Sequence, residues 1–133
     1  MKLITRNTDY AVKALTYICR NKKGVISVTE LAQELKIPRP FLRRILQILN
    51  KKKLLKSYKG REGGFMLASR PEDILLVDLI EIFQGPAMLN KCVFKKKLCP
   101  DRNSCALKYR IDSIEKYVIE ELKSITLASL LQK

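Results

Sequence analysis

The stretch that decides the fold runs from Ser27 to Leu67 and reads SVTELAQELKIPRPFLRRILQILNKKKLLKSYKGREGGFML. Between Pro38 and Lys53, apolar residues recur at intervals of three and four, which predicts a helix with one face against a core. These residues are Leu42, Ile45, Leu46 and Leu49. Long hydrogen-bonding side chains fall on another face, namely Arg39, Arg43, Gln47 and Asn50. Such a helix suits the reading of a base edge or a phosphate, so we interpret it as a recognition helix.

The residues before this helix predict a second, shorter one. Ser27-Val28-Thr29-Glu30 matches a capping box. The apolar face of the short helix is predicted to comprise Val28, Leu31, Ala32 and Leu35. Lys36 and Ile37 make the turn, and Pro38 suits the first helical position because it has no N–H to leave unbonded. Two short helices joined by a tight turn, the second one basic, form a helix-turn-helix.

Two strand-like runs follow the recognition helix, in LLKSYKGREGGFMLA from Leu54 to Ala68. They flank a turn from Lys59 to Gly64, whose glycines permit positive φ angles. A basic hairpin tip after a helix-turn-helix indicates a winged helix. The expected fold class is therefore mainly α with a small β-hairpin wing.

Positive charge is concentrated in the same half of the chain. Residues 1–70 hold 17 Lys and Arg against 4 Asp and Glu, a net charge of +13, whereas residues 71–133 hold 10 against 9, a net charge of +1. A basic surface that served only solubility would not gather nearly all of the total charge of +14 in one half. The pattern favours a domain that binds a polyanion, and a helix-turn-helix makes double-stranded DNA the expected partner.

Helices are also expected on both sides of the winged helix. Asn7 or Thr8 can cap a first helix from about Asp9 to Arg20. Its predicted buried face comprises Ala11, Ala14, Leu15 and Ile18, with Cys19 as a small core residue. After the wing, ILLVDLIEIFQG predicts a helix that ends at Gly85-Pro86. Its inward residues are predicted to be Val77, Ile80 and Phe83.

A long helix is predicted from Cys105 onward, because apolar residues recur with the spacing of a coiled-coil seam. They are Leu107, Ile111, Ile114, Val118, Leu122 and Ile125. A helix of about 20 residues extends roughly 30 Å, too far to be buried against one small winged helix, so we expect a homodimer. The closing SITLASLL predicts a short turn or helix that packs Leu127, Leu130 and Leu131.

Length and composition indicate one domain with extensions. At 133 residues, of which 47% are hydrophobic, the chain can build a core. We divide it into a winged helix-turn-helix at 1–84, a cysteine-bearing loop at 85–105, and a dimerisation helix with a tail at 106–133. No apolar run approaches about 18 residues and no signal-peptide pattern is present, so we expect a soluble, cytoplasmic protein without a membrane partner. The chain has no His and no phosphate-binding glycine loop, which argues against an enzyme.

Three cysteines lie in a segment with little periodicity. They are Cys92, Cys99 and Cys105, with spacing C-x6-C-x5-C. Such a group can hold zinc or an iron–sulfur cluster, can sense oxidants through its thiols, or can be inert. The absence of a close cysteine pair and of His disfavours structural zinc. Wider gaps better suit a cluster, whose irons are spread apart, but the residues alone leave the alternatives open.

The order of these parts resembles the Rrf-two family of bacterial transcription regulators. The resemblance rests on TDYAVKAL at 8–15, SVTELAQELKIP, the recognition helix, the YKGREGGFML wing, the cysteine trio and ITLASLL. It covers essentially the whole chain and is most specific in the wing and the cysteines. It implies a homodimeric DNA-binding repressor with an iron–sulfur cluster on each subunit, [4Fe-4S] favoured and [2Fe-2S] as the other type.

The resemblance also implies a fourth cluster ligand. In the family's iron–sulfur assembly regulator this ligand is a His three residues after the last cysteine, where this chain has Lys108. In the nitric-oxide-sensing branch it is a carboxylate from the first helix of the other subunit, and Asp9 occupies the similar place. The implied ligand set is Cys92, Cys99 and Cys105 with Asp9 of the partner subunit. Because oxygen donors hold iron less firmly than thiolates do, such a site would leave an iron open to nitric oxide or oxygen.

For DNA, the family places the start of the second helix of the helix-turn-helix in the major groove and the wing tip toward the minor groove. On a palindromic operator this implies contacts from Arg39, Arg43, Arg44, Gln47, Lys59 and Arg61. The assembly regulator carries Glu at the position of Arg43, so its operator preference does not transfer. Loss of the cluster is expected to change the spacing of the two recognition helices, and with it the affinity for DNA.

Two alternatives compete with this prediction. One is a cluster-free repressor of the same family, regulated by cysteine oxidation or by a partner protein. The other, of a different class, is a zinc-stapled RNA-binding protein. Metal content and operator specificity discriminate between them.

Overall fold

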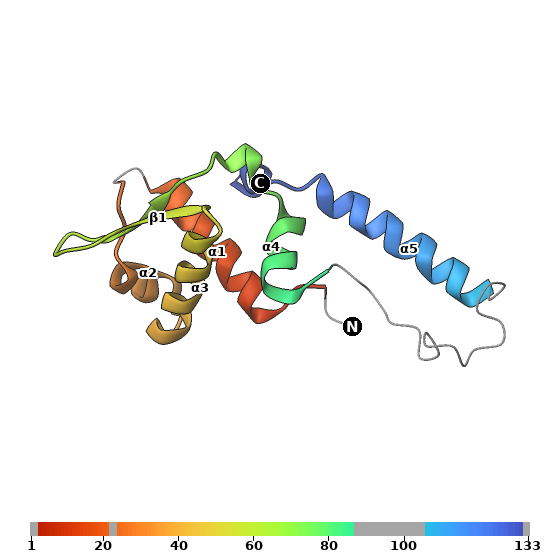
Figure 1. Cartoon of the computed structure of the whole chain (residues 1–133), viewed down its shortest axis with the longest axis horizontal. Coiled ribbons are helices and arrows are strands. Elements are labelled where there is room, and N and C mark those ends of the chain that lie inside the picture. Colours follow the sequence, from red (N-terminus) through yellow and green to blue (C-terminus); the bar gives the residue numbers. More distant parts are fainter. Residues whose placement is uncertain (1–2, 22–23, 87–105, 132–133) are drawn as a thin grey trace.

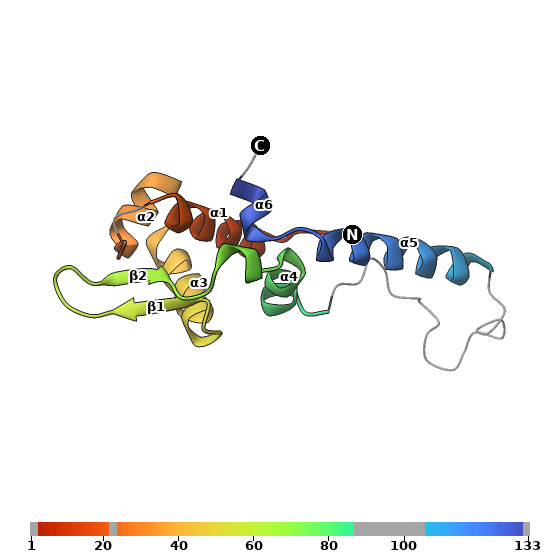
Figure 2. The ribbon, with the colours of Figure 1, turned by 90° about the horizontal axis from the view of Figure 1, so that it is seen from above.

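The computed structural model describes residues 3–21, 24–86 and 106–131. Its elements are, in order, α1 (Arg6–Arg20), α2 (Val28–Leu35), α3 (Arg39–Lys51), β1 (Leu55–Tyr58), β2 (Gly64–Leu67), the 3-10 helix η1 (Pro71–Asp73), α4 (Leu76–Gln84), α5 (Ala106–Lys123) and α6 (Leu127–Leu131). Figures 1 and 2 show a body of helices with the β1–β2 hairpin projecting at one end and α5 extending away at the other. The predicted fold class, mainly helical with a small hairpin wing, is confirmed.

The core lies between α1 and α3, which contribute the two apolar faces predicted from the sequence. Every residue predicted to be buried on these two helices is at most 4% exposed. They are Ala11, Ala14, Leu15 and Ile18 of α1, and Leu42, Ile45, Leu46 and Leu49 of α3. Burial of each large apolar side chain stabilises the fold by about 1.5–3 kcal/mol, so these two faces set the orientation of α3 relative to the body.

The start of α1 differs from the prediction. The helix begins at Arg6 rather than Asp9, and Thr5, not Asn7 or Thr8, is its N-cap residue. The Thr5 side chain makes no capping hydrogen bond. Instead, Gln84 at the end of α4 accepts a hydrogen bond from the backbone N–H of Thr5 at 2.8 Å. The sequence motif for a local cap was misleading because the group that bonds this end of the helix lies 79 residues away.

The helix-turn-helix is capped at its start as predicted, but only by one half of the capping box. The Ser27 hydroxyl accepts a hydrogen bond from the backbone N–H of Glu30 at 3.1 Å. The Glu30 carboxylate does not return to Ser27; it accepts hydrogen bonds from Tyr17 at 3.2 Å and Asn21 at 3.3 Å. Glu30 therefore joins α2 to the last turn of α1 instead of completing a local motif.

The turn between α2 and α3 is short and stiff. Lys36 adopts a left-handed conformation, with φ 55°, which ends α2. Pro38 was predicted to be the first residue of the helix, but it is the N-cap residue that precedes the helix. Arg39 and Pro40 are the first two residues of α3. Because prolines fix φ near −65°, they restrict the path of the chain as it enters the recognition helix.

The wing is an antiparallel hairpin that is tied to the body. β1 pairs with β2 from Leu55 opposite Leu67 to Tyr58 opposite Gly64. Phe65 also pairs with Ile26 through two backbone hydrogen bonds of 2.8 and 2.9 Å. A Cβ atom at Gly64 would clash with the carbonyl of Ile26, so glycine is required here for close backbone approach. The hairpin is therefore anchored directly before α2.

The helices that precede and follow α5 in the chain, α4 and α6, both pack against the body. Val77 and Ile80 of α4 form a small cluster with Leu122 at the end of α5. The backbone N–H of Leu76 donates to Ile125 at 3.0 Å, and that of Leu127 donates to Ile74 at 2.8 Å. The predicted inward residues of α4 are buried at Val77 and Ile80 and half-buried at Phe83, while Leu79, which was not predicted, is 1% exposed. In α6, Leu127 is buried, and Leu130 and Leu131 are half-buried.

Candidate nucleic-acid interface

The outward side of α3 carries the basic residues that the sequence singled out. While Leu42, Ile45, Leu46 and Leu49 fill the core, all four polar candidates on this helix are exposed; they are Arg39, Arg43, Arg44 and Gln47. Within the ranges that the structure describes, none of the three arginines forms an ion pair with a carboxylate. Their guanidinium groups are thus available for phosphates or guanine edges.

The wing tip adds two further cations to this interface. Lys59 and Arg61 are exposed and lie in the turn between β1 and β2. The turn is closed by a hydrogen bond from the N–H of Gly63 to the carbonyl of Gly60 at 3.0 Å, and Gly60 has a φ of 110°. The hairpin in Figure 2 carries this tip outward beyond the helices of the body. The tip therefore presents a second exposed basic surface, apart from that of α3.

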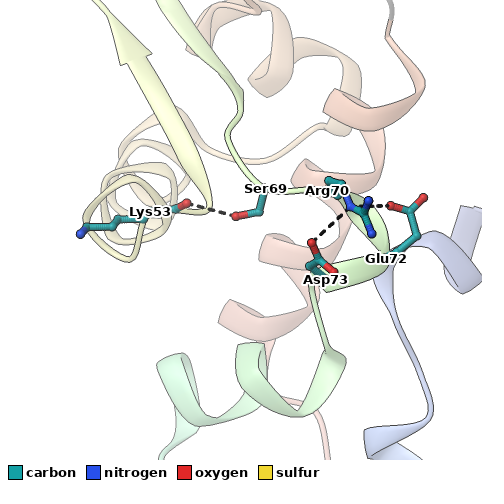
Figure 3. Close-up of polar contacts among 5 residues, drawn as sticks. All are labelled: Lys53, Ser69, Arg70, Glu72 and Asp73. Atoms are coloured by element: carbon teal, nitrogen blue, oxygen red, sulfur yellow. Dashed lines mark hydrogen bonds and ion pairs between the residues drawn. The ribbon is translucent and has the colours of Figure 1, made fainter.

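Contacts at the base of the wing, which were not predicted from the sequence, hold the hairpin against the end of α3. Figure 3 shows the Ser69 hydroxyl donating to the carbonyl of Lys53 at 3.2 Å. Lys53 itself is left-handed, with a φ of 66°, and next to it Leu54 accepts a hydrogen bond from the N–H of Ala68 at 2.9 Å. These bonds fix the wing relative to the recognition helix.

Arg70 lies beside this base but differs from the cations of α3. Its guanidinium is 3.3 Å from Asp73 and 3.7 Å from Glu72, in exposed ion pairs (Figure 3). Two neighbouring carboxylates offset its charge. Arg70 therefore contributes less net positive charge to this surface than the arginines of α3, which have no carboxylate partner within the described ranges.

Of the four predicted cluster ligands, only Asp9 lies in the described part of the chain. Cys92, Cys99 and Cys105 fall at 87–105, outside it, and the described ranges contain no group of three His, Cys, Asp or Glu side chains suited to a metal. Asp9 lies in the first turn of α1, where its carboxylate pairs with Lys13 at 2.9 Å. Its hydrogen bond and charge raise the pKa of Lys13. The Asp9 side chain is 45% exposed, so it remains accessible to another group.

The structure also shows the contacts of Lys108 and Cys19, two positions considered in the sequence. Lys108, which stands where the assembly regulator has a His ligand, pairs with Asp112 at 2.6 Å on the exposed side of α5. Cys19 is half-buried against the core, and burial, assisted by the charge of Glu72, raises the pKa of its thiol. A raised pKa keeps this thiol protonated and poorly reactive, in line with the structural role expected from the sequence.

The exposed basic helix, the short helix that precedes it and the projecting hairpin define a winged-helix DNA-binding protein. The chain belongs to the Rrf2 family, whose model, described as "Iron-dependent Transcriptional regulator", matches residues 4–133. Within the described ranges, no helix has the length and apolar character needed to span a membrane.

Several curated relatives and solved structures resemble the chain over most of its length. It is 32% identical over 124 residues to a protein of Aquifex aeolicus named as an HTH-type transcriptional regulator, covering 92% of this chain and 86% of that protein. It is 25% identical over 132 residues to the HTH-type transcriptional regulator NsrR of Bacillus subtilis, covering 92% and 90% of the two chains. These relatives agree with the prediction of a DNA-binding regulator rather than an enzyme.

Two solved structures of differently named proteins also resemble the chain. CymR, the global cysteine regulator of Bacillus subtilis, superposes with a TM-score of 0.78 at 26% identity, covering 98% of this chain and 97% of CymR. IscR of T. potens superposes with a TM-score of 0.74 at 27% identity, covering 99% and 87%. The family and fold are therefore shared with regulators of more than one kind.

Proposed function

We propose that this chain forms a cytoplasmic homodimer that binds a palindromic operator as a repressor, through α3 and the wing. The observation that carries this proposal is the outward face of α3, where Arg39, Arg43 and Arg44 are exposed without carboxylate partners in the part of the chain that the structure describes. A helix with this face, held by a buried apolar stripe, matches the geometry in which a recognition helix enters the major groove.

Dimerisation is supported by the uneven burial of the predicted α5 seam. At the end nearest the body Leu122 is 5% exposed, whereas Ile114 is 53% and Leu107 is 70% exposed. A second copy of the chain would cover these apolar residues. Ile114→Asp should convert the dimer to monomer in sedimentation velocity, while Ser113→Asp, which adds the same charge away from the seam, should leave it dimeric. Equal sedimentation of both variants would contradict the α5 interface.

We further propose that operator affinity is controlled by an iron–sulfur cluster held by Cys92, Cys99 and Cys105 with Asp9 of the partner subunit. Three thiolates and one carboxylate form a donor set that suits cluster irons. The ion pair of Asp9 with Lys13 is exposed and of the i,i+4 kind, worth only about 0.3–0.5 kcal/mol, so little opposes the transfer of Asp9 to a metal. When bound, the cluster would supply the reactivity toward oxidants or nitric oxide.

Metal analysis of protein purified without oxygen tests this part of the proposal. About four irons and four acid-labile sulfides per chain, with broad visible absorption, support a [4Fe-4S] cluster. Asp9→Ala should then weaken or change the cluster spectrum, whereas Asp78→Ala, which removes an exposed first-turn carboxylate from α4, should not. Stoichiometric zinc would contradict the cluster. Identical operator affinities of cluster-loaded and cluster-free protein would contradict the proposal that the cluster controls DNA binding.

A second candidate function follows from the similarity to CymR, the global cysteine regulator of Bacillus subtilis. In this case the dimer binds the operator without iron, and oxidation of its cysteines or a partner protein regulates it. Protein that contains no metal after anaerobic purification, and whose operator affinity changes on thiol oxidation, would support this candidate over the cluster.

A further inference from the structure

Phe41 is the large apolar side chain that is exposed on the outward part of α3. It is 54% exposed, although its neighbours Leu42 and Ile45 are at most 2% exposed. Leu42 is rotated from Phe41 by about 100° around the helix axis, so the two side chains serve different faces. Much of the Phe41 ring is therefore exposed to water, which is unfavourable for an apolar surface of this size.

Its position makes a nucleic-acid contact the natural use of this ring. Phe41 lies in the first turn of α3, and the N-terminal residues of a recognition helix are those that reach base edges. Arg44, three residues on, is exposed on the same side of the helix and is a cation that would bring a DNA duplex to this surface. The turn with Pro38 and Pro40 restricts the backbone there, so the ring is presented at low cost in chain entropy. The other exposed aromatic residues of the described chain lie on the wing strand (Tyr58) and on α5 (Tyr109, Tyr117).

We propose that Phe41 contacts the C5-methyl group of a thymine in each operator half-site and is a specificity-determining residue. Phe has no donor or acceptor for the hydrogen-bonding edges of the bases, and in the major groove the thymine methyl is the apolar feature it can bury. Arg44, on the same side of the helix, can pair with a guanine nearby, so a polar and an apolar reader lie on one helix turn. This inference rests on the proposed operator binding and adds the identity of one base in the site.

The test uses duplexes that differ by single methyl groups. The full-length dimer first selects its best site from a pool of randomised duplexes, and each thymine of that site is then replaced in turn by uracil, which lacks only the methyl. At one thymine position, the same in both half-sites, replacement by uracil should weaken binding by wild-type protein about fourfold per half-site. This is the change in affinity expected when one buried group the size of a methylene is removed. Phe41→Ala should bind the thymine and uracil duplexes equally.

Two further variants separate base reading from a general loss of structure. Phe41→Leu retains an apolar side chain and should keep part of the discrimination. Tyr109→Ala removes an aromatic side chain that is 72% exposed on α5 and should keep all of it. If no uracil substitution weakens binding by wild-type protein, or if Phe41→Ala still discriminates, the inference is wrong while operator binding stands. If selection enriches no duplex, operator binding itself is wrong, and the inference with it.

Discussion

The hydrogen bonds of Gln84 to the start of α1 make a quantitative prediction about stability. The Gln84 side-chain oxygen accepts from the Thr8 hydroxyl at 2.6 Å and from the Thr5 N–H at 2.8 Å, and its amide nitrogen donates to the carbonyl of Leu3 at 3.2 Å. Because a backbone N–H can only donate, the bond from Thr5 fixes which end of the amide is the acceptor. Thr8 is 0% exposed and is the buried polar residue of the described core.

The cost of removing Gln84 follows from this geometry. Gln84→Ala removes the 2.6 Å acceptor of the buried Thr8 hydroxyl and leaves that hydroxyl only its 3.4 Å contact with the Thr5 hydroxyl. We expect this loss to cost about 1–3 kcal/mol, and the half-buried N–H of Thr5 loses its acceptor as well. We expect the free energy of unfolding to fall by about 2–3 kcal/mol. Thr8→Val removes the hydroxyl with little change in shape and should cost about 1 kcal/mol. In the double variant no hydroxyl is left unpaired, so the two losses should not add.

A double-mutant cycle measured by guanidinium denaturation, at one fixed protein concentration, isolates this interaction. The expected coupling free energy between Thr8→Val and Gln84→Ala is about 1–2 kcal/mol. Gln33→Ala, which truncates an exposed glutamine on α2, is the matched control and should change stability by less than about 0.5 kcal/mol. Additive losses, with a coupling below about 0.3 kcal/mol, would refute the assignment of these bonds as a stabilising contact.

Three other predictions test the interface, the wing and the free thiol. If Arg43 holds a phosphate, Arg43→Ala should lower the slope of log affinity against log salt concentration by about 1 and should weaken binding to all operator variants equally. A loss of affinity confined to one base position would instead show that Arg43 reads a base. Lys116→Ala on α5 is the control. Gly64→Ala should destabilise the protein by about 2–4 kcal/mol in denaturation, since the added Cβ would break the pairing of Phe65 with Ile26; an unchanged midpoint would contradict the close approach. In a variant whose only cysteine is Cys19, alkylation at about pH 8 should be slower than that of glutathione, because burial raises the pKa of the Cys19 thiol. The alkylation rate should increase only as the pH rises above the ordinary thiol pKa. Equal rates for Cys19 and glutathione at that pH would contradict this prediction.

The parts of the fold that could be read from the sequence are those fixed by local patterns. The apolar spacing of α1 and α3 predicted their buried faces residue by residue, because a helix places residues three and four apart on one side whatever it packs against. The wing could be predicted because strand-forming residues flank a glycine-rich turn. The exposure of Arg39, Arg43 and Gln47 followed from the same periodicity, since the side opposite a buried stripe faces solvent, whereas Asn50 on the same predicted face is half-buried.

Contacts between distant residues could not be read in this way. The cap of α1 was misplaced because Gln84 lies on another helix, and nothing near Thr5 in the sequence indicates it. Gly64 was expected to permit a positive φ angle, and its φ is 158°, but its close approach to the Ile26 carbonyl was not predicted. No prediction was made for the exposure of Phe41. For the start of α1 and for Gly64, the deciding neighbour lies in a distant part of the chain.

These distant contacts make α1 the connection between the two halves of the proposed mechanism. At its start, Thr5 and Thr8 are bonded to Gln84, which directly precedes the cysteine-bearing segment at 85–105. At its end, Tyr17 donates to Glu30 at 3.2 Å and so holds α2, the helix before the recognition helix. Because both contacts are made by one continuous 15-residue helix that packs on α3, we expect a displacement at either end to be transmitted as a rigid-body movement rather than absorbed by a loop. In the proposed mechanism, α1 carries Asp9 and contacts α2, so it would be the element that links a cluster to the proposed DNA-binding surface.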